Sequence, residues 1–384
     1  MFPSAQKRLL ALDGGGILGL ISLQILRAIE NQLRRFAPKP ADFRLRDFFD
    51  YIGGTSTGAI IGAGLALGMS VDELITFYEV SGHAMFTKAR LLERMRYRFD
   101  VAPLVDLLKG VIGEHSILDL QKQGKLREDK HLLIVTQNIS SDSPWPLSTN
   151  PRAKFNDETR RDCNRFVPLW QLVRASTAAP TYFAPQEIEF EKGNKASLRK
   201  FEDGGVTPYN NPAFLLYRMA TLPEYRCEWP DGEDRMMLVS IGTGCVTFPA
   251  PLMNTGGRNL LGSALTIPRG LMQRISAEND IQCRTVGRCV FGGKIDNEIG
   301  SLVKPLASPT DNLGRRFLYA RYDPDLTDTG LTNMGLAHLT KRTFAIDDVS
   351  QMPELGSIGR KYAEQVDVSA HFPTFMVRSA HSVT

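Results

Sequence analysis

Cysteine is scarce in this sequence, and the few residues present do not form a recognisable framework. The 384 residues include five cysteines, an odd number, and no two of them follow the C-x-x-C spacing. This pattern excludes a disulfide scaffold and a cysteine-based zinc site, and it is typical of reduced thiols in a cytoplasmic protein. The H-E-x-x-H, P-loop and EF-hand patterns are also absent, so we expect no metal and no cofactor. The cysteines are Cys163, Cys227, Cys245, Cys283 and Cys289.

Long hydrophobic runs are missing as well. The longest nearly apolar stretch, from Ala59 to Met69, falls short of the ~20 residues that a membrane span requires, and the N-terminus lacks the apolar run of a secretion signal. The net charge of +4 is compatible with an anionic lipid surface. The basic, amphipathic segment 83–99 either lies on such a surface or packs on the core with a solvated basic face. We expect a cytoplasmic protein with only peripheral contact with the inner membrane.

Buried strands alternate with amphipathic helices through the first 250 residues. Strands are predicted at 8–13, 50–52, 132–138 and 237–241, and helices at 17–36, 59–67 and 71–80. This alternation indicates an α/β fold with a mainly parallel central sheet. After residue 250 the strand signal weakens, and one helix is predicted at about 270–285. We therefore expect a catalytic domain at 7–250 and a partly helical C-terminal extension at 251–384 packed on it.

Two further segments are candidates for functional roles. Residues 140–165 form a long irregular excursion, and loops of this length often act as lids or binding loops. Four arginines within or beside the predicted C-terminal helix either bind a phosphate-bearing ligand or are solvated surface charges. These arginines are Arg269, Arg274, Arg284 and Arg288.

The sequence Gly54-Thr55-Ser56-Thr57-Gly58 fits the G-x-S-x-G pattern. It lies between a predicted strand and a predicted helix, which is the context that the pattern requires for a serine nucleophile. The glycines let neighbouring backbone approach closely, and the helix N-terminus favours developing negative charge. The alternative is a serine that caps a helix in a glycine-rich turn.

A second glycine-rich turn, Asp13-Gly14-Gly15-Gly16-Ile17-Leu18-Gly19, follows the first predicted strand. Consecutive glycines free backbone N–H groups to converge on one point, as an oxyanion hole requires. The same residues satisfy G-x-G-x-x-G, the dinucleotide-binding fingerprint. That interpretation needs an acidic residue about 20 positions on, at the end of the next strand, whereas Glu30 falls within the predicted helix.

The third motif is Asp203-Gly204-Gly205. An aspartate beside the serine hydroxyl can remove its proton directly, without a histidine. The alternative is a turn aspartate before two glycines. None of the histidines that follow, His338, His371 and His381, stands in a recognisable active-site context.

These motifs, in this order, resemble the patatin-like phospholipase family over residues 7–250. The stretches 174–183 (RASTAAPTYF), 209–212 (YNNP) and 240–244 (SIGTG) are similar to family positions as well. The resemblance implies a three-layer α/β/α fold, Ser56 as nucleophile, Asp203 as base, and an oxyanion hole built by Gly14, Gly15 and Gly16. The substrate it implies is membrane phospholipid.

One departure from the family is Leu18, where the glycine loop usually carries Arg or Lys; this puts a preference for phosphate headgroups in question. The layout also resembles the cyclic-nucleotide-activated patatin effectors of CBASS antiphage systems. That likeness implies a cyclic di- or trinucleotide activator and a homo-oligomer, and no nucleic acid polymer as partner. The alternatives are a constitutive lipase or esterase, a catalytically silent ligand-sensing patatin fold, and a dinucleotide-dependent oxidoreductase.

Overall fold

Nine strands form a single mixed sheet in the part of the chain that the computed structural model describes, residues 6–89, 96–245, 260–306 and 314–376. The strand order is β5-β6-β3-β2-β1-β7-β9-β8, and β4 pairs with β3 outside this path. Six neighbouring strands, from β3 through β8, run parallel; β4, β5 and β6 pair antiparallel to their neighbours. The bounds are β1 Lys7–Leu12, β2 Tyr51–Thr55, β3 His131–Asn138, β4 Ser143–Ser148, β5 Gln186–Glu189, β6 Leu198–Asp203, β7 Met236–Ile241, β8 Arg288–Phe291 and β9 Leu318–Tyr322.

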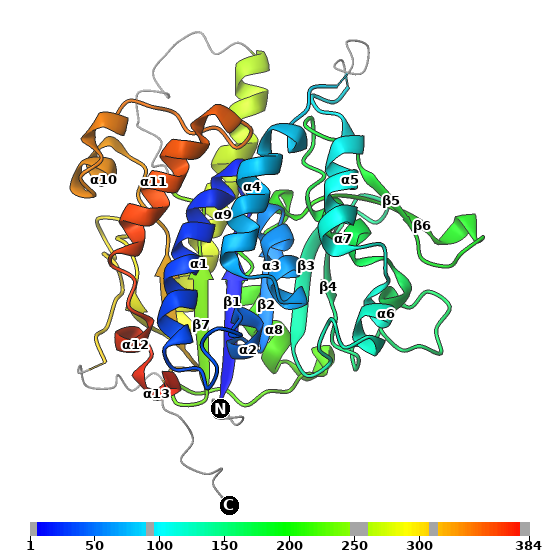
Figure 1. Ribbon diagram of the computed structural model, residues 1–384, viewed down its shortest axis with the longest axis horizontal. Helices are drawn as coiled ribbons and strands as arrows, with labels where there is room; N and C mark the ends of the chain where they lie inside the picture. The colour runs from blue at the N-terminus through cyan, green and yellow to red at the C-terminus, as the bar shows by residue number, and fades with distance from the viewer. Residues whose placement is uncertain (1–5, 90–95, 246–259, 307–313, 377–384) are drawn as a thin grey trace, which may run out of the picture.

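Helices cover both faces of this sheet because its central strands are apolar on both sides. In β1, Leu10 and Leu12 join one buried cluster while Leu9 and Ala11 join the other. The first cluster packs under α1 (Gly19–Arg34), α3 (Thr57–Leu67), α4 (Val71–Met85) and α11 (Met352–Ala363), which lie in front of the strands in Figure 1. The second packs under α8 (Ala213–Thr221) and α9 (Leu260–Val286). The predicted three-layer α/β/α fold is confirmed.

The remaining described helices extend the first face and its edges. They are α2 Leu45–Phe48, α5 Val101–Ile112, α6 Ile117–Lys122, α7 Leu169–Ser176, α10 Asp328–Asn333, α12 Val368–His371 and α13 Pro373–Met376. None of the helices within the described ranges is both long and apolar enough to traverse a bilayer.

Part of the predicted loop 140–165 is a strand. Residues Ser143–Ser148 form β4, which pairs antiparallel with β3 from Asn138 back to Leu133. The sequence indicates a loop here because Pro144 and Pro146 donate no backbone hydrogen bond. A strand that pairs on one side only, as β4 does, tolerates these prolines.

Because β4 returns the chain to the start of β3, residues 149–165 lie at the amino edge of the parallel strands. There they line a surface cleft of about 800 Å³ together with Arg226 and Glu228. Ser56 follows β2 at the opposite, carboxyl edge. Residues 149–165 therefore lie at the edge of the sheet away from Ser56.

The region after residue 250 contributes more strand than the sequence predicts. β8 and β9 extend the same sheet beyond β7. Arg288 at the start of β8 and Arg321 near the end of β9 depart from the apolar pattern that identifies a buried strand, yet both side chains are buried. The extension at 251–384 thus shares its sheet with residues 7–250.

The basic segment 83–99 is not one continuous helix in its described part. α4 ends at Met85, and Lys88 pairs with Phe99 through an antiparallel bridge, so the chain folds back on itself. Phe86 and Phe99 pack against each other and against Phe183. Residues 90–95, on which a membrane-surface role depends, lie outside the described residues.

Candidate active site

The chain reverses sharply at Ser56, between the end of β2 and the start of α3. Ser56 has φ 53° and ψ −121°, outside the regions that L-residues ordinarily occupy. Holding a non-glycine residue in such a region costs about 1–3 kcal/mol, and strain of this kind clusters at functional sites. The turn presents the serine hydroxyl at the carboxyl edge of the sheet, as the sequence predicts for a nucleophile turn.

The glycines of the motif are required by close backbone contacts around this turn. A Cβ on Gly54 would overlap the carbonyl group of Gly58, and a Cβ on Gly58 would overlap the carbonyl oxygen of Leu12. The first turn of α3 therefore packs directly on the end of β1. This explains why G-x-S-x-G needs a glycine two positions away on each side of Ser56.

The register of three strands places Asp203 beside Ser56. β4 pairs with β3 at both Val135 and Thr136 and therefore occupies one edge of β3 there. β2 pairs with β3 at Val135 and β6 pairs with it at Thr136, so β2 and β6 share the other edge. β2 ends with Thr55 opposite Val135, and β6 arrives antiparallel and ends with Asp203 opposite Thr136. The two strand ends thus meet at consecutive positions of β3.

The side chains of Ser56 and Asp203 are hydrogen-bonded to each other. The Ser56 hydroxyl donates to Asp203 Oδ2 at 2.6 Å, and the N–H of Gly205 donates to the other carboxylate oxygen at 2.7 Å. Both side chains are buried, with 9% and 4% of their surface exposed. Of the described histidines, none hydrogen-bonds to either residue; His381 lies outside the described residues. The hydroxyl of Ser56 is thus in direct contact with a carboxylate that can accept its proton.

The buried environment of Asp203 raises the pKa of its carboxyl group. Burial raises the pKa of Asp203 to about 6, while the Ser56 hydroxyl, the Gly205 N–H and the charge of Arg174 act in the opposite direction. The carboxylate of Glu202 adds a smaller upward contribution to the pKa. A carboxylate with a pKa near 6 is mostly ionised at neutral pH, yet accepts a proton more readily than an exposed aspartate does.

The glycine loop lies beside this pair, and its amides are divided between structural bonds and the site. Gly14 N–H donates to the carbonyl oxygen of Asn210 at 3.2 Å, and Ile17 N–H donates to that of Ile346 at 2.8 Å. No acceptor in the described part of the chain engages the N–H of Gly15 or Gly16. These two amides, rather than that of Gly14, are the ones available to an oxyanion.

The conformation of Gly16 depends on having no side chain. It has φ 58°, in the left-handed region, and a Cβ there would overlap the carbonyl oxygen of Ile346. Leu18, which occupies the position where the family usually has a cation, is 3% exposed within the core. Its side chain is therefore directed into the protein and not towards a headgroup.

Two polar side chains of α7 support the site and were not identified as site residues in the sequence. Ser176 Oγ accepts the N–H of Ser56 at 2.9 Å and donates to the carbonyl oxygen of Val135 at 2.6 Å. Arg174 is fully buried, and burial lowers its pKa to about 10. Both fall in the stretch 174–183, whose match to the family was the only available signal of their importance.

Two of the four C-terminal arginines considered as phosphate ligands are buried and paired with acids. Arg284 forms a bidentate pair with Asp280 at 2.8 and 2.6 Å, and Arg288 pairs with Glu233 at 3.2 Å. Neither presents a free guanidinium to a ligand. Among the described residues, no three His, Cys, Asp or Glu side chains are grouped as metal ligands.

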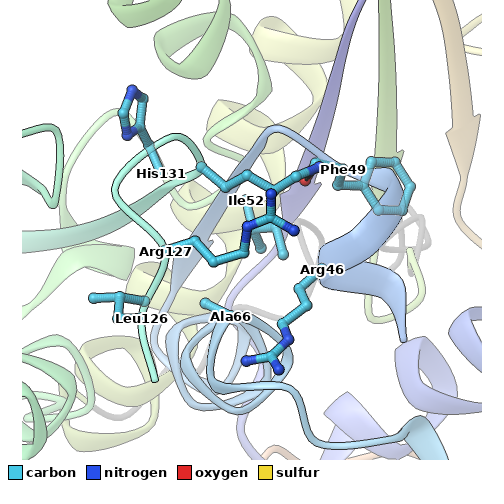
Figure 2. Close-up of a pocket in the computed structure, with 8 residues that line it drawn as sticks. Arg46, Phe49, Ile52, Ala66, Leu126, Arg127 and His131 are labelled. Atoms are coloured by element: carbon cyan, nitrogen blue, oxygen red, sulfur yellow. Dashed lines mark hydrogen bonds between the residues drawn. The ribbon is translucent and has the colours of Figure 1, made fainter. Parts of the chain in front are cut away.

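A second hollow, shown in Figure 2, lies far from the Ser56 site. It is lined by side chains at the amino edge of the sheet, including Ile52 near the start of β2 and His131 at the start of β3. Its volume of about 10 Å³ suits at most a water molecule. It therefore offers no space for a lipid.

The family model described as patatin-like phospholipase matches residues 10–217, more than half of the chain. A cGAMP-activated phospholipase of Vibrio cholerae is 31% identical over 222 residues, which cover 55% of this chain and 56% of that protein. Patatin group J-1 of Solanum tuberosum is 28% identical over 249 residues, covering 61% and 60%.

The chain thus spans less than two thirds of the length of these two relatives. Among solved structures, VipD from Legionella pneumophila aligns at 15% identity with a TM-score of 0.38, over 95% of this chain and 67% of that one. The family match over 10–217 includes Ser56, Asp203 and the glycine loop. This chain therefore belongs to the patatin-like phospholipase family.

Proposed function

We propose that this chain is a lipid acyl hydrolase of the phospholipase A type, with Ser56 as nucleophile and Asp203 as base. The observation that carries the proposal is the 2.6 Å hydrogen bond from the Ser56 hydroxyl to the buried carboxylate of Asp203, in a chain of this family. A silent, ligand-sensing fold has no need to keep a strained serine in contact with a buried base. A dinucleotide-dependent oxidoreductase is disfavoured because Glu30 lies inside α1, far from the end of β2.

In the first half of the reaction, Asp203 takes the Ser56 proton as Oγ attacks the carbonyl carbon of an acyl ester. The N–H groups of Gly15 and Gly16 stabilise the negative charge that develops on the carbonyl oxygen. The tetrahedral intermediate collapses, Asp203 returns the proton to the leaving alkoxide, and the lysolipid departs from an acyl-enzyme. In the second half, Asp203 takes a proton from water, whose oxygen attacks the acyl carbon. Asp203 then returns the proton to Ser56 Oγ as the fatty acid leaves, which restores the free enzyme.

The proposal specifies how the rate depends on pH. The base must be ionised in the free enzyme, and the pKa of Asp203 is about 6. We therefore expect kcat/KM to be constant above that value and to fall about tenfold for each pH unit below it. A pH–rate profile with a soluble ester measures this limb. A profile that stays flat down to pH 4 would contradict a base with a raised pKa.

Labelling with a fluorophosphonate, combined with lipid mass spectrometry, tests the function directly. The probe should attach to Ser56, as peptide mapping would show, and the unlabelled protein should release fatty acid and lysolipid from phospholipid vesicles. Exposed Ser141 serves as the internal control and should remain unlabelled. Absence of both labelling and hydrolysis would leave the silent fold as the better description.

We further propose that a cyclic di- or trinucleotide activates this hydrolase, that it then acts on the inner membrane from the cytoplasm, and that activation changes its oligomeric state. The support is the 31% identity to a relative whose name records activation by cGAMP. We expect fatty-acid release to rise on addition of one member of a panel of cyclic nucleotides, with sedimentation measured in parallel. Equal activity with and without every member would favour a constitutive lipase.

A further inference from the structure

Arg321, near the end of β9, is a buried cation whose guanidinium joins three separate segments. Its two terminal nitrogens donate to both carboxylate oxygens of Asp13 at 2.9 and 2.7 Å. They also donate to Ser240 Oγ at 2.7 Å and to Asp323 Oδ2 at 2.8 Å. Arg321 and Asp13 are each only 4% exposed. This residue lies beyond residues 10–217, the part of the chain that matches the family model.

Stability alone does not account for such a group. Removing two charges from water costs about as much as their attraction returns, so a buried ion pair is weak evidence for stabilisation. An apolar pair would fill the same space between β1 and β9. The position of Asp13 supplies a different reason, because it is the residue immediately before Gly14, Gly15 and Gly16.

The contacts of Arg321 extend to the loop that packs on the glycine turn from the other side. Asp323 accepts the N–H of Gly244 at 2.8 Å, and Thr243 donates its hydroxyl to the carbonyl oxygen of Gly14 at 3.1 Å. The Thr243 side chain also occupies the space that a Cβ on Gly15 would need. One guanidinium thus fixes the carboxylate that begins the glycine loop and the aspartate that orders the loop packed against it.

We propose that Arg321 is a positioning residue of the active site: by fixing Asp13 and Asp323, it holds the N–H groups of Gly15 and Gly16 in line with the Ser56 hydroxyl. The role assigned to those amides rests on the proposed function; the positioning of the loop does not. The C-terminal part of the chain therefore supplies a residue that positions the active site.

The planar fork of arginine is what this role requires. Four donors arranged in one plane reach Asp13, Ser240 and Asp323 together, whereas a lysine ammonium is a single point charge that cannot span them. Arg321→Lys keeps the positive charge beside the two carboxylates and removes the fork. It therefore separates positioning from simple charge neutralisation.

Arg284→Lys is the matched control. Arg284 is also buried and bidentate to an aspartate, Asp280, and no hydrogen bond joins it to the glycine loop within the described residues. Both variants lose an arginine fork from a buried pair. Only the Arg321 variant should affect residues 13–19.

We expect Arg321→Lys to lower kcat by about 10- to 100-fold relative to Arg284→Lys, because small displacements of stabilising groups cost rate on this scale. KM should change by less than about threefold, since amides that act on the transition state contribute little to ground-state binding. Amide hydrogen exchange over residues 13–19, measured by mass spectrometry, should be faster in Arg321→Lys than in both wild type and Arg284→Lys.

Equal kcat and equal exchange in the two folded variants would overturn the proposal. If wild type hydrolyses no lipid or ester, with or without any member of the cyclic-nucleotide panel, the proposed function fails, and the exchange of residues 13–19 still decides whether Arg321 positions the loop. If Arg321→Lys does not fold, Asp13→Asn, which keeps the shape of the side chain, replaces it. Faster exchange over the loop in folded Asp13→Asn supports the proposal, and wild-type exchange there contradicts it.

Discussion

Ser56→Ala is expected to lower the rate of fatty-acid release by roughly 10⁵-fold or more, to the level of residual catalysis by binding and oxyanion contacts. The substitution removes the only atom that forms the acyl-enzyme bond in the proposed mechanism. It leaves the turn intact, because alanine keeps the Cβ and therefore the same backbone geometry at φ 53°. Initial rates on phospholipid vesicles, with a soluble ester as a second substrate, measure the effect.

The loss should not be a consequence of unfolding. Ser56→Gly provides a comparison that is equally unable to form an acyl-enzyme but relieves the backbone strain at this position, which we expect to raise the free energy of unfolding by about 1 kcal/mol. Ser141→Ala, on the exposed turn before β4, should retain full activity. Activity of Ser56→Ala within tenfold of wild type would eliminate Ser56 as the nucleophile.

Local sequence rules were sufficient to predict the turn at Ser56. A short apolar strand, G-x-S-x-G and a helix of small residues each restrict the backbone over a few positions, so β2, the turn and α3 followed from the sequence alone. The same holds for β1, β3 and β7, whose apolar runs are uninterrupted. The glycine loop was located equally well, but which of its amides are free depends on Asn210 and Ile346, residues distant in the chain.

Contacts between distant segments were not predictable in this way. The proximity of Asp203 to Ser56 arises because an antiparallel strand, β6, ends on the same edge of β3 as β2, and nothing in the local pattern of residues 198–203 specifies that register. Only the family resemblance linked the two residues. β9 was missed for a related reason: Arg321 breaks its apolar pattern, and its partner Asp13 is 308 positions away.

Asp203→Asn is expected to lower kcat by about 10³- to 10⁴-fold, the upper range for loss of a general base. The amide has the same shape as the carboxylate. Its oxygen can accept the Gly205 N–H, while its NH₂ group donates to Ser56 Oγ and cannot take the proton. Exposed Asp106→Asn on α5 is the matched control and should leave the rate unchanged. A rate within tenfold of wild type for Asp203→Asn would exclude Asp203 as the base.

The same substitution should stabilise the protein at neutral pH, which distinguishes a functional carboxylate from a structural one. The pKa of Asp203 is raised in the folded state from 3.8 to about 6, so the folded protein binds this proton more tightly than the unfolded chain does. Ionisation of Asp203 therefore lowers the free energy of unfolding as the pH rises from about 4 to above 6. A neutral amide avoids this cost, so we expect the free energy of unfolding of Asp203→Asn to exceed that of wild type by roughly 1–2 kcal/mol at pH 7. This is less than the full effect of the pKa shift, because hydrogen bonds to an amide are weaker than those to a carboxylate. The difference in stability should disappear near pH 4, where Asp203 of wild type is protonated as well.

Urea denaturation of both proteins at pH 7 and pH 4 measures this difference. A variant less stable than wild type at pH 7 would indicate that the carboxylate serves the fold and not the chemistry.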